Sequence, residues 1–296
     1  MVATTKELIL TFPAQHTLGN LYLSKQVFPH NRTWVGQAAG EAKLNLPPES
    51  MIGLALSHDV DAKMAEGSAA ALNQIHSMDL STSKYSAPFL AAMMKLSALR
   101  ELRLDFLTLS TQDFINLNES SCLETLWLTG SSVDDQMLPV LQGVKSLTSL
   151  ILKSTKISNS SMKALATLPK LKNLHLPATI TDDGAEALSQ SASIEDLDLS
   201  YTALSAAAIK SLAVLKTLST LYVNDTTLGD DSVAYVKDMP ALKVLFLNGT
   251  QITDKCLDSL AEAAQLEHLE LRDTKVTEIG IARLRGKMKD CAIFGP

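Results

Sequence analysis

Pairs of adjacent aspartates recur along the chain and have the residue type needed to hold a metal ion or to perform acid–base catalysis. The pairs are Asp134-Asp135, Asp182-Asp183 and Asp230-Asp231. All three fall within one residue of the same phase of a repeating pattern, where helices are expected to begin. A carboxylate at a helix start accepts hydrogen bonds from free backbone N–H groups and interacts favourably with the helix dipole. We therefore interpret these pairs as structural.

Other potentially reactive groups are also too sparse for catalysis. The densest cluster, His58-Asp59-Val60-Asp61, lacks further ligands at a useful spacing. The cysteines Cys122, Cys256 and Cys291 are too few and too scattered for a disulfide framework or a paired-thiol metal site. The sequence also contains no nucleophile elbow, phosphate-binding loop, zinc-protease helix or kinase motif set. We expect no catalytic residue, no metal and no cofactor, and hence no enzyme.

Composition restricts the location and the partners. Of the 296 residues, 46% are hydrophobic and 20% are charged, as in a folded soluble protein. No run approaches the roughly 18 apolar residues of a membrane helix, and Lys6 and Glu7 interrupt the N-terminal stretch where a signal peptide would need an apolar core. The net charge of -6, without a large basic cluster, argues against nucleic acid. The sequence predicts a cytoplasmic protein with no membrane or nucleic-acid partner.

A short apolar pattern, L-x-x-L-x-L, recurs at a nearly constant interval and indicates the elements that must position any site. Steps are 24 residues long, except for one of 23 residues between the copies that begin at Leu171 and Ile194. With two degenerate copies, the chain carries ten repeats. The copies begin at Met51, Ile75, Leu99, Leu123, Leu147, Leu171, Ile194, Leu218, Leu242 and Leu266.

Each repeat reads as one strand followed by one short helix. The L-x-L alternation is typical of a strand with leucines pointing inward. A capping residue then precedes an apolar helical face such as Met162, Leu165 and Leu168. The expected capping residues are Ser110, Asp134, Ser158, Thr181, Ser205, Gly229, Thr253 and Thr277. One such turn cannot bury its leucines alone, so neighbouring turns must stack into a parallel sheet on the concave side with helices on the convex side.

In seven successive repeats, a hydroxyl residue lies three positions after the last apolar residue of the pattern. These residues are Ser131, Thr155, Thr179, Thr202, Thr226, Thr250 and Thr274. With this column, the chain resembles the leucine-rich repeat, in a 24-residue variant similar to that of bacterial repeat proteins, with Thr where Asn is commonest. The resemblance implies an α/β horseshoe-shaped solenoid and binding as its mode of action. We expect the threonine hydroxyl to connect one turn's backbone to the next.

Both ends of the array look like covers for its open leucine layers. Residues 1–50 lack the period and predict a small β-rich N-terminal cap, with strands around Glu7–Leu10, Leu21–Leu23 and Lys43–Leu46 and a turn at Gly19-Asn20. Residues 51–286 hold the repeats, and residues 287–296 form a closing turn and strand in which Phe294 shields the last leucines. The segment after Leu46 superficially resembles an F-box, but its apolar residues belong to the first repeat, so a ubiquitin-ligase adaptor is not expected.

The outward position between the strand leucines is unusually aromatic for an exposed column. It includes Trp127, Ile151, Tyr222 and Phe246, while a flanking column adds further rings. Rigid aromatic residues are typical interface anchors, and charged neighbours would set orientation. The predicted binding residues of the concave face are Arg103, Phe106, Trp127, Lys153, His175, Asp198, Tyr201, Tyr222, Phe246, Glu270 and Arg272.

The sequence thus predicts a monomeric or weakly self-associating module that binds a protein or peptide ligand on its concave face. Three alternatives remain open. The rings could stabilise the sheet by cross-strand contact alone. They could instead form platforms for a carbohydrate or cell-wall ligand, or they could be hidden in a scaffold or homo-oligomer.

Overall fold

The computed structural model describes residues 6–13, 17–24, 32–56, 67–81 and 83–295. The His58–Asp61 cluster therefore lies outside the described residues. The chain divides into two compact units. The first, called the N-terminal unit, comprises residues 1–132 and 143–148, and the second, called the C-terminal unit, comprises residues 133–142 and 149–296.

The N-terminal unit contains a two-stranded antiparallel ribbon and a larger sheet in the order β8-β7-β6-β5-β2-β3. Strands β5 to β8 are parallel, whereas β2 is antiparallel to both β5 and β3. The strands are β1 (Lys6–Thr11), β2 (Gly19–Ser24), β3 (Thr33–Gln37), β4 (Glu41–Leu46), β5 (Met51–Leu56), β6 (Ser77–Asp79), β7 (Glu101–Arg103) and β8 (Thr125–Trp127). The helices are α2 (Ala69–Leu72), α3 (Ala87–Met93) and α4 (Thr111–Leu117).

The β-rich nature of the N-terminal segment is confirmed, but its expected turn at Gly19-Asn20 is wrong. Gly19 opens β2, where its φ is +152° and a Cβ atom would lie 2.0 Å from the carbonyl oxygen of Ala55 on β5. Glycine is needed there because the backbone of β5 approaches too closely for any side chain. The sequence also missed β3, which carries Trp34 edge-on against Tyr22 at 5.6 Å between ring centroids.

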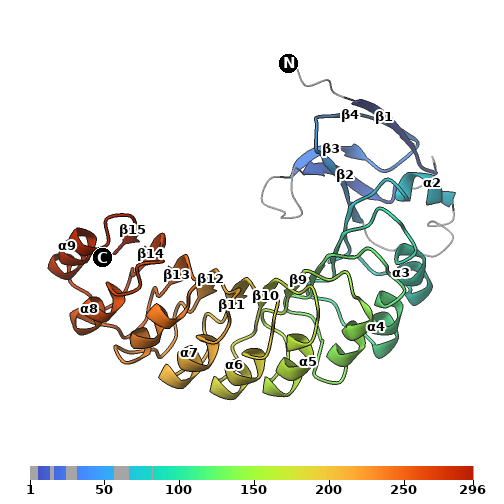
Figure 1. The fold of residues 1–296 in the computed structure, drawn as a ribbon. Helices are drawn as coiled ribbons and strands as arrows, with labels where there is room; N and C mark the ends of the chain where they lie inside the picture. The colour runs from blue at the N-terminus through green and yellow to red at the C-terminus, as the bar shows by residue number, and fades with distance from the viewer. Residues whose placement is uncertain (1–5, 14–16, 25–31, 57–66, 82, 296) are drawn as a thin grey trace. The chain divides into compact units, whose positions relative to one another are not determined.

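The C-terminal unit is a regular stack of parallel strands, in which each strand except the last is followed by an α-helix or a 3-10 helix, with α5 to α8 lying on the side away from the strands (Figure 1). Its strands are β9 (Ser149–Ile151), β10 (Asn173–His175), β11 (Asp196–Asp198), β12 (Thr220–Tyr222), β13 (Val244–Phe246), β14 (His268–Glu270) and β15 (Ala292–Phe294). Its α-helices are α5 (Met162–Ala166), α6 (Asp182–Leu188), α7 (Ala206–Leu212), α8 (Leu257–Leu260) and α9 (Glu278–Lys287).

The repeat pattern places the leucines in the core as expected. Parallel register sets Leu174 beside Leu197 and Leu221 beside Leu245, and all four side chains are at most 1% exposed. Burying one leucine stabilises a fold by roughly 1.5–3 kcal/mol. Each leucine column therefore contributes a continuous apolar layer, which confirms the solenoid within each unit.

Helix starts are mostly where the sequence predicts them. Ser110, Ser158, Thr181, Ser205, Thr253 and Thr277 precede the helix or 3-10 turn of their repeats. Asp134 and Gly229 do not precede α-helices, because their repeats form the 3-10 helices η2 (Leu138–Gly143) and η4 (Ser232–Asp238). Pro139 removes a backbone donor from η2, and β-branched valines reduce the helix propensity of η4. Two further 3-10 turns, η3 (Asn159–Ser161) and η5 (Asp254–Cys256), lead into α5 and α8.

The threonine column does not connect neighbouring repeats in the way expected. Most of its hydroxyls donate to the carbonyl of the last apolar residue of their own repeat, three positions earlier, as in Thr155 to Leu152 at 2.7 Å and Thr250 to Leu247 at 2.6 Å. Only Thr179, among the column members described, donates to the preceding repeat, at Ile157. A hydroxyl on a short stem reaches its own turn more easily than the next one, so the column closes turns within repeats.

Aspartates at the helix starts provide the connection between repeats instead. Asp230 accepts hydrogen bonds from the backbone N–H and the hydroxyl of Thr253 at 2.7 and 2.8 Å, and Asp254 does the same for Thr277 at 2.8 and 2.7 Å. Equivalent pairs are Asp135 with Ser158, Asp182 with Ser205 and, through an amide, Asn159 with Thr181. The structural interpretation of these acids is thus confirmed, although their main partner is the capping residue of the following repeat.

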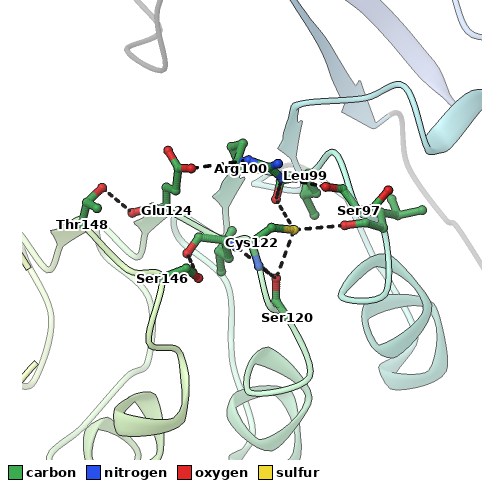
Figure 2. A network of polar contacts seen from close by, with 10 residues as sticks. Ser97, Leu99, Arg100, Ser120, Cys122, Glu124, Ser146 and Thr148 are labelled. Atoms are coloured by element: carbon green, nitrogen blue, oxygen red, sulfur yellow. Dashed lines mark hydrogen bonds and ion pairs between the residues drawn. The ribbon is translucent and has the colours of Figure 1, made fainter. Parts of the chain in front are cut away.

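A second inter-repeat connection lies just before the strands and includes Cys122 (Figure 2). The Cys122 thiol donates to the carbonyl of Leu99 at 3.2 Å, and the Ser146 hydroxyl donates to that of Leu123 at 2.7 Å. In the C-terminal unit, Ser193 and Thr217 occupy the same position of their repeats and donate in the same way at 2.8 and 2.7 Å. Cys122 therefore occupies a structural hydroxyl position of the repeat.

Candidate functional site

The outward side chains of the strands form a strand face on each unit. In each repeat, the strand face consists of four residues. They are the first and third residues of the parallel strand and the two residues that follow the next inward apolar residue. Ile151 belongs to this set by sequence but is only 3% exposed. The expectation that Ile151 is an exposed anchor is therefore wrong, whereas the predicted aromatic residues are half-buried or exposed.

On the N-terminal unit, arginines cover the aromatic rings. The Arg103 guanidinium lies 4.2 Å from the ring centroid of Trp127 and pairs with Asp105 at 3.2 Å. Arg32 repeats this arrangement over Tyr22 at 4.3 Å, and pairs with Asp79 at 3.0 Å. A guanidinium attracts both an aromatic face and a carboxylate, so each set combines a ring, a cation and an acid from this chain alone.

Beneath the arginines lies a buried polar chain. Tyr22 and the Ser77 hydroxyl share a hydrogen bond of 2.7 Å, and Ser77 donates to Glu101 at 2.7 Å. Burial raises the pKa of Glu101 above its usual range, although the Ser77 bond opposes the shift. Gly53 makes room for this chain, because a Cβ there would lie 2.0 Å from the Tyr22 ring. The network therefore belongs to the folded core of this face.

Phe106 differs from these residues because it is 74% exposed and has a left-handed backbone, with φ of 60°. That conformation is costly for a bulky side chain. Its ring lies over Gly130, where an added Cβ would approach a ring carbon to 2.5 Å. Glycine at position 130 therefore leaves the space in which the exposed Phe106 ring packs.

On the C-terminal unit, the rings contact each other across successive strands. Tyr222 and Phe246 stack with centroids 4.5 Å apart and planes 9° apart. Phe246 then meets His268 at 5.4 Å, and His268 meets Phe294 at 5.0 Å. We call Tyr222, Phe246, His268 and Phe294 the aromatic row. It spans β12 to β15 and forms a continuous half-apolar surface.

Carboxylates flank the row on β11. Lys153 pairs with Asp198 at 2.9 Å, and the His175 ring contacts Asp198 at 3.5 Å and Asp196 at 3.7 Å. Burial lowers the pKa of His175, so the ring is neutral at pH 7 and leaves Asp196 without a compensating positive charge. Burial and the neighbouring Asp198 raise the pKa of Asp196 to about 6. Burial and both acids also raise the pKa of Tyr222 to about 12, which shows that the acids act on the row.

The other side of the row ends in a second charged group. Glu270 contacts His268 at 3.3 Å and Arg272 at 3.6 Å, and it accepts a hydrogen bond from Asn248 at 3.1 Å. Arg272 also lies 5.6 Å from the Phe294 ring centroid. At this end of the row, the Glu270 carboxylate is therefore already paired with side chains of the chain itself.

Tyr201 is the counterpart of Phe106 on this unit. It is 67% exposed, and its φ is 68°. Most other positions of this left-handed column hold small turn residues: Gly130, Ser154, Asp225, Gly249 and Asp273. A largely exposed aromatic side chain at a position that favours glycine or aspartate gains little from packing, which makes Tyr201 and Phe106 functional candidates.

The structure groups the predicted residues into these two faces and adds three that sequence reasoning missed. Asp196 and His268 occupy the first outward position of their strands, a column that the sequence analysis did not consider. Phe294 was expected to shield the last leucine layer, but Ile293 does so at 5% exposed while Phe294 is 39% exposed and extends the row. The alternation of inward and outward residues in β15 was the signal for this.

The described part of the chain contains no group of three or more His, Cys, Asp or Glu side chains that could hold a metal ion. Nor does any described helix have the length and apolar character needed to cross a membrane.

Comparison with known proteins identifies the fold. No family model and no curated protein matches the chain. Among solved structures, it is similar to an internalin C2 from Listeria monocytogenes, with 21% identity and a TM-score of 0.50 over 71% of this chain and 84% of that chain. A second internalin from the same organism shares 17% identity, with a TM-score of 0.45 over 76% of this chain and 74% of that chain. Together with the repeat geometry, the first likeness shows that the chain has the leucine-rich-repeat fold.

Proposed function

We propose that the chain is a non-enzymatic interaction module that binds a protein or peptide ligand on the strand face of its C-terminal unit. The aromatic row carries this proposal. Its rings lie on the outward side of four consecutive strands, on a face that is otherwise acidic and polar. Rigid rings that are partly exposed before binding gain most from being covered by a partner.

The predicted residues divide between two contact areas. Lys153, His175, Asp198, Glu270 and Arg272 surround the row as its polar rim, and Tyr201 projects beside it. Arg103, Phe106 and Trp127 form a separate candidate area on the N-terminal unit, where Phe106 is the exposed anchor. Because arginines already cover the rings of that unit, we assign the main contact to the C-terminal unit.

Residues 1–50 and 287–296 serve as caps of an array that spans residues 51–286. The module acts in the cytoplasm without a cofactor, which agrees with three unpaired cysteines, Cys122, Cys256 and Cys291. The acidic strand faces support a partner other than nucleic acid.

Paired affinity capture tests the proposal. The wild-type chain and a Tyr222→Ala/Phe246→Ala variant are used as baits in a lysate of the expressing cells, and captured proteins are quantified by mass spectrometry. Tyr235→Ala is the matched control, because Tyr235 lies in η4 on the helix side. Circular dichroism must show that all three chains are equally folded.

We expect at least one protein to be captured by the wild type and by Tyr235→Ala but lost by the double variant. Equal lists for all baits would contradict the proposal. A carbohydrate ligand would instead appear on a glycan array and depend on the same two rings, and self-association would appear as a mass that rises with concentration in light scattering.

A further inference from the structure

The strand face of the C-terminal unit has an uncompensated negative charge. Its cations are Lys153 and Arg272, and its carboxylates are Asp196, Asp198, Asp225, Glu270 and Asp273. Two positive charges against five negative ones leave a net charge of -3 on this face. On an exposed surface of this kind, a positively charged ligand is favoured over a neutral or acidic one.

The excess charge is next to the stacked rings. Parallel register places Asp198 beside Tyr222, Tyr222 beside Phe246, and Phe246 beside Glu270. Strands in a sheet are about 4.8 Å apart, so each acid is within one strand spacing of a ring. This row of acid, ring, ring and acid can hold a flat cation that contacts a ring face and a carboxylate together.

Asp196, two residues before Asp198 on β11, is the acid of this face with the least compensation. Its Oδ1 atom is buried and accepts no hydrogen bond from the described residues. Its neighbours on β10 are Asn173 and His175, its neighbours on β12 are Thr220 and Tyr222, and Asp198 lies on its own strand. None of these groups is positively charged at pH 7, and Lys153 pairs with Asp198.

The N-terminal unit shows what chemistry fits such a site. There, Arg103 lies over Trp127 and pairs with Asp105, and Arg32 lies over Tyr22 and pairs with Asp79. On the C-terminal unit, no cation of the described chain lies over Tyr222 or Phe246, although Arg272 lies at the far end of the row. The combination of a ring and a carboxylate thus occurs twice with an arginine of the chain itself on the N-terminal unit, and on the C-terminal unit it occurs without one over Tyr222.

We propose that the ligand of the C-terminal unit is a basic peptide segment, and that an arginine side chain of this segment lies on Tyr222 and pairs with Asp196. This inference rests on the proposed function and specifies its partner chemistry. Arginine fits better than lysine, because a planar guanidinium both stacks on a ring and presents two donors to a carboxylate.

Titration with matched peptides tests the inference. The probes are acetylated and amidated tetra-arginine, tetra-lysine and tetra-citrulline, in which citrulline keeps the shape of arginine without its charge. Binding to the full chain is followed by NMR at low salt. We expect tetra-arginine to bind about five-fold more tightly than tetra-lysine, and tetra-citrulline to show no saturation.

Variants localise the effect. Asp196→Asn and Tyr222→Ala should each weaken tetra-arginine binding by about five-fold. Asp183→Asn makes the same charge change on α6, on the helix side, and should leave affinity within about 1.5-fold if the effect is local rather than a general attraction to an acidic protein.

The outcomes separate this inference from the proposed function. Equal affinity for arginine and citrulline peptides, or equal losses for Asp196→Asn and Asp183→Asn, would overturn the arginine site, while ring-dependent protein capture would still support the interaction module. Arginine selectivity that depends on Asp196, without any ring-dependent protein capture, would support the site and contradict the proposed function.

Discussion

On the N-terminal unit, Arg103 and Arg32 cover the rings of Trp127 and Tyr22, whereas on the C-terminal unit Tyr222 and Phe246 stack on each other and contact the rings of His175 and His268. Both faces combine aromatic rings with carboxylates, and Trp127, Tyr222 and Phe246 hold the same position of the repeat, the third residue of the strand. They differ in whether the cation comes from the chain itself. On the N-terminal unit the cation belongs to the chain, and on the C-terminal unit we propose that a partner supplies it.

The acids Glu101 and Asp196 differ in the charges around them. Each has one buried oxygen that accepts no hydrogen bond from the described residues, Oε1 in Glu101 and Oδ1 in Asp196. The positive charges of Arg103 and Arg32 lie near Glu101, whereas the negative charge of Asp198 lies near Asp196. An unsatisfied buried charge reduces the stability of the free protein. This loss of stability fits our proposal that a positively charged ligand neutralises the Asp196 carboxylate when it binds.

The largest predicted effect comes from disrupting the buried hydrogen bonds beneath the arginines of the N-terminal unit. Gly53→Val would drive a side chain into the Tyr22 ring and break its bond with Ser77. We expect the free energy of unfolding to fall by about 3 kcal/mol, measured by urea denaturation. Gly286→Ala is the control, since a Cβ there meets nothing within 4 Å, and it should be neutral or stabilising. A Gly53→Val protein as stable as the wild type would mean that this network is not part of the core.

The next effect tests the uncompensated acid of the C-terminal face. The pKa of Asp196 is raised to about 6, so the folded state binds its proton more tightly than the unfolded state does. Stability therefore rises as pH falls from 7 towards 4 on account of this group. Asp196→Asn should remove that rise and stabilise the protein at pH 7 by about 1.5 kcal/mol after allowance for solvent screening.

The measurement is denaturation of the wild type and Asp196→Asn between pH 4.5 and 7.5. His175 contributes the opposite slope, because its lowered pKa disfavours protonation in the folded state. Only the difference between the two proteins reports Asp196. If the two pH profiles are parallel, Asp196 titrates normally and the contrast with the N-terminal unit is lost.

A smaller effect compares the two exposed aromatic residues with left-handed backbones. Tyr201→Asn should stabilise the protein by about 1 kcal/mol, since asparagine tolerates this conformation. Phe106→Asn should gain less, because it also removes the contact between the Phe106 ring and Gly130. Thermal unfolding measures both. A loss of stability in Tyr201→Asn would show that Tyr201 serves the fold and not a ligand.

The smallest effect concerns a feature that both units share. Cys122→Ser replaces the thiol with the group that donates at the same position in other repeats, such as Ser146 (Figure 2) and Ser193. We expect a change in unfolding free energy of less than about 0.5 kcal/mol. A change several times larger would indicate that Cys122 has a role that a repeat hydroxyl lacks.

Much of the fold is predictable from the sequence because leucine burial has a strict period. The spacing of Leu174, Leu197 and Leu221 alone predicts parallel strands in register. The outward position of Tyr222 and Phe246 follows from the same alternation. These are consequences of backbone geometry, which depends little on the neighbouring side chains.

The details that distinguish the two faces are not predictable in this way. Whether a ring is covered by Arg103 or by another ring depends on which side chains face each other across strands, not on the spacing within one strand. The left-handed backbone at Tyr201 contradicts its residue type, so no propensity indicates it. The partner of Asp230 lies 23 residues away, and a helix-capping rule considers only nearby groups.

The hydrogen bonds from Asp230 to Thr253 and from Asp254 to Thr277 bear on how the gene can change length. The repeat that contains both Thr253 and Asp254 thus receives a carboxylate from the repeat before and supplies one to the next. Deleting residues 230–253 would place Asp254 after Gly229 with its bond to Thr277 intact. Duplication or loss of one whole repeat therefore needs no compensating substitution, and insertions of other lengths do. The array can be extended or shortened in evolution by unequal recombination while its aromatic row changes one strand at a time.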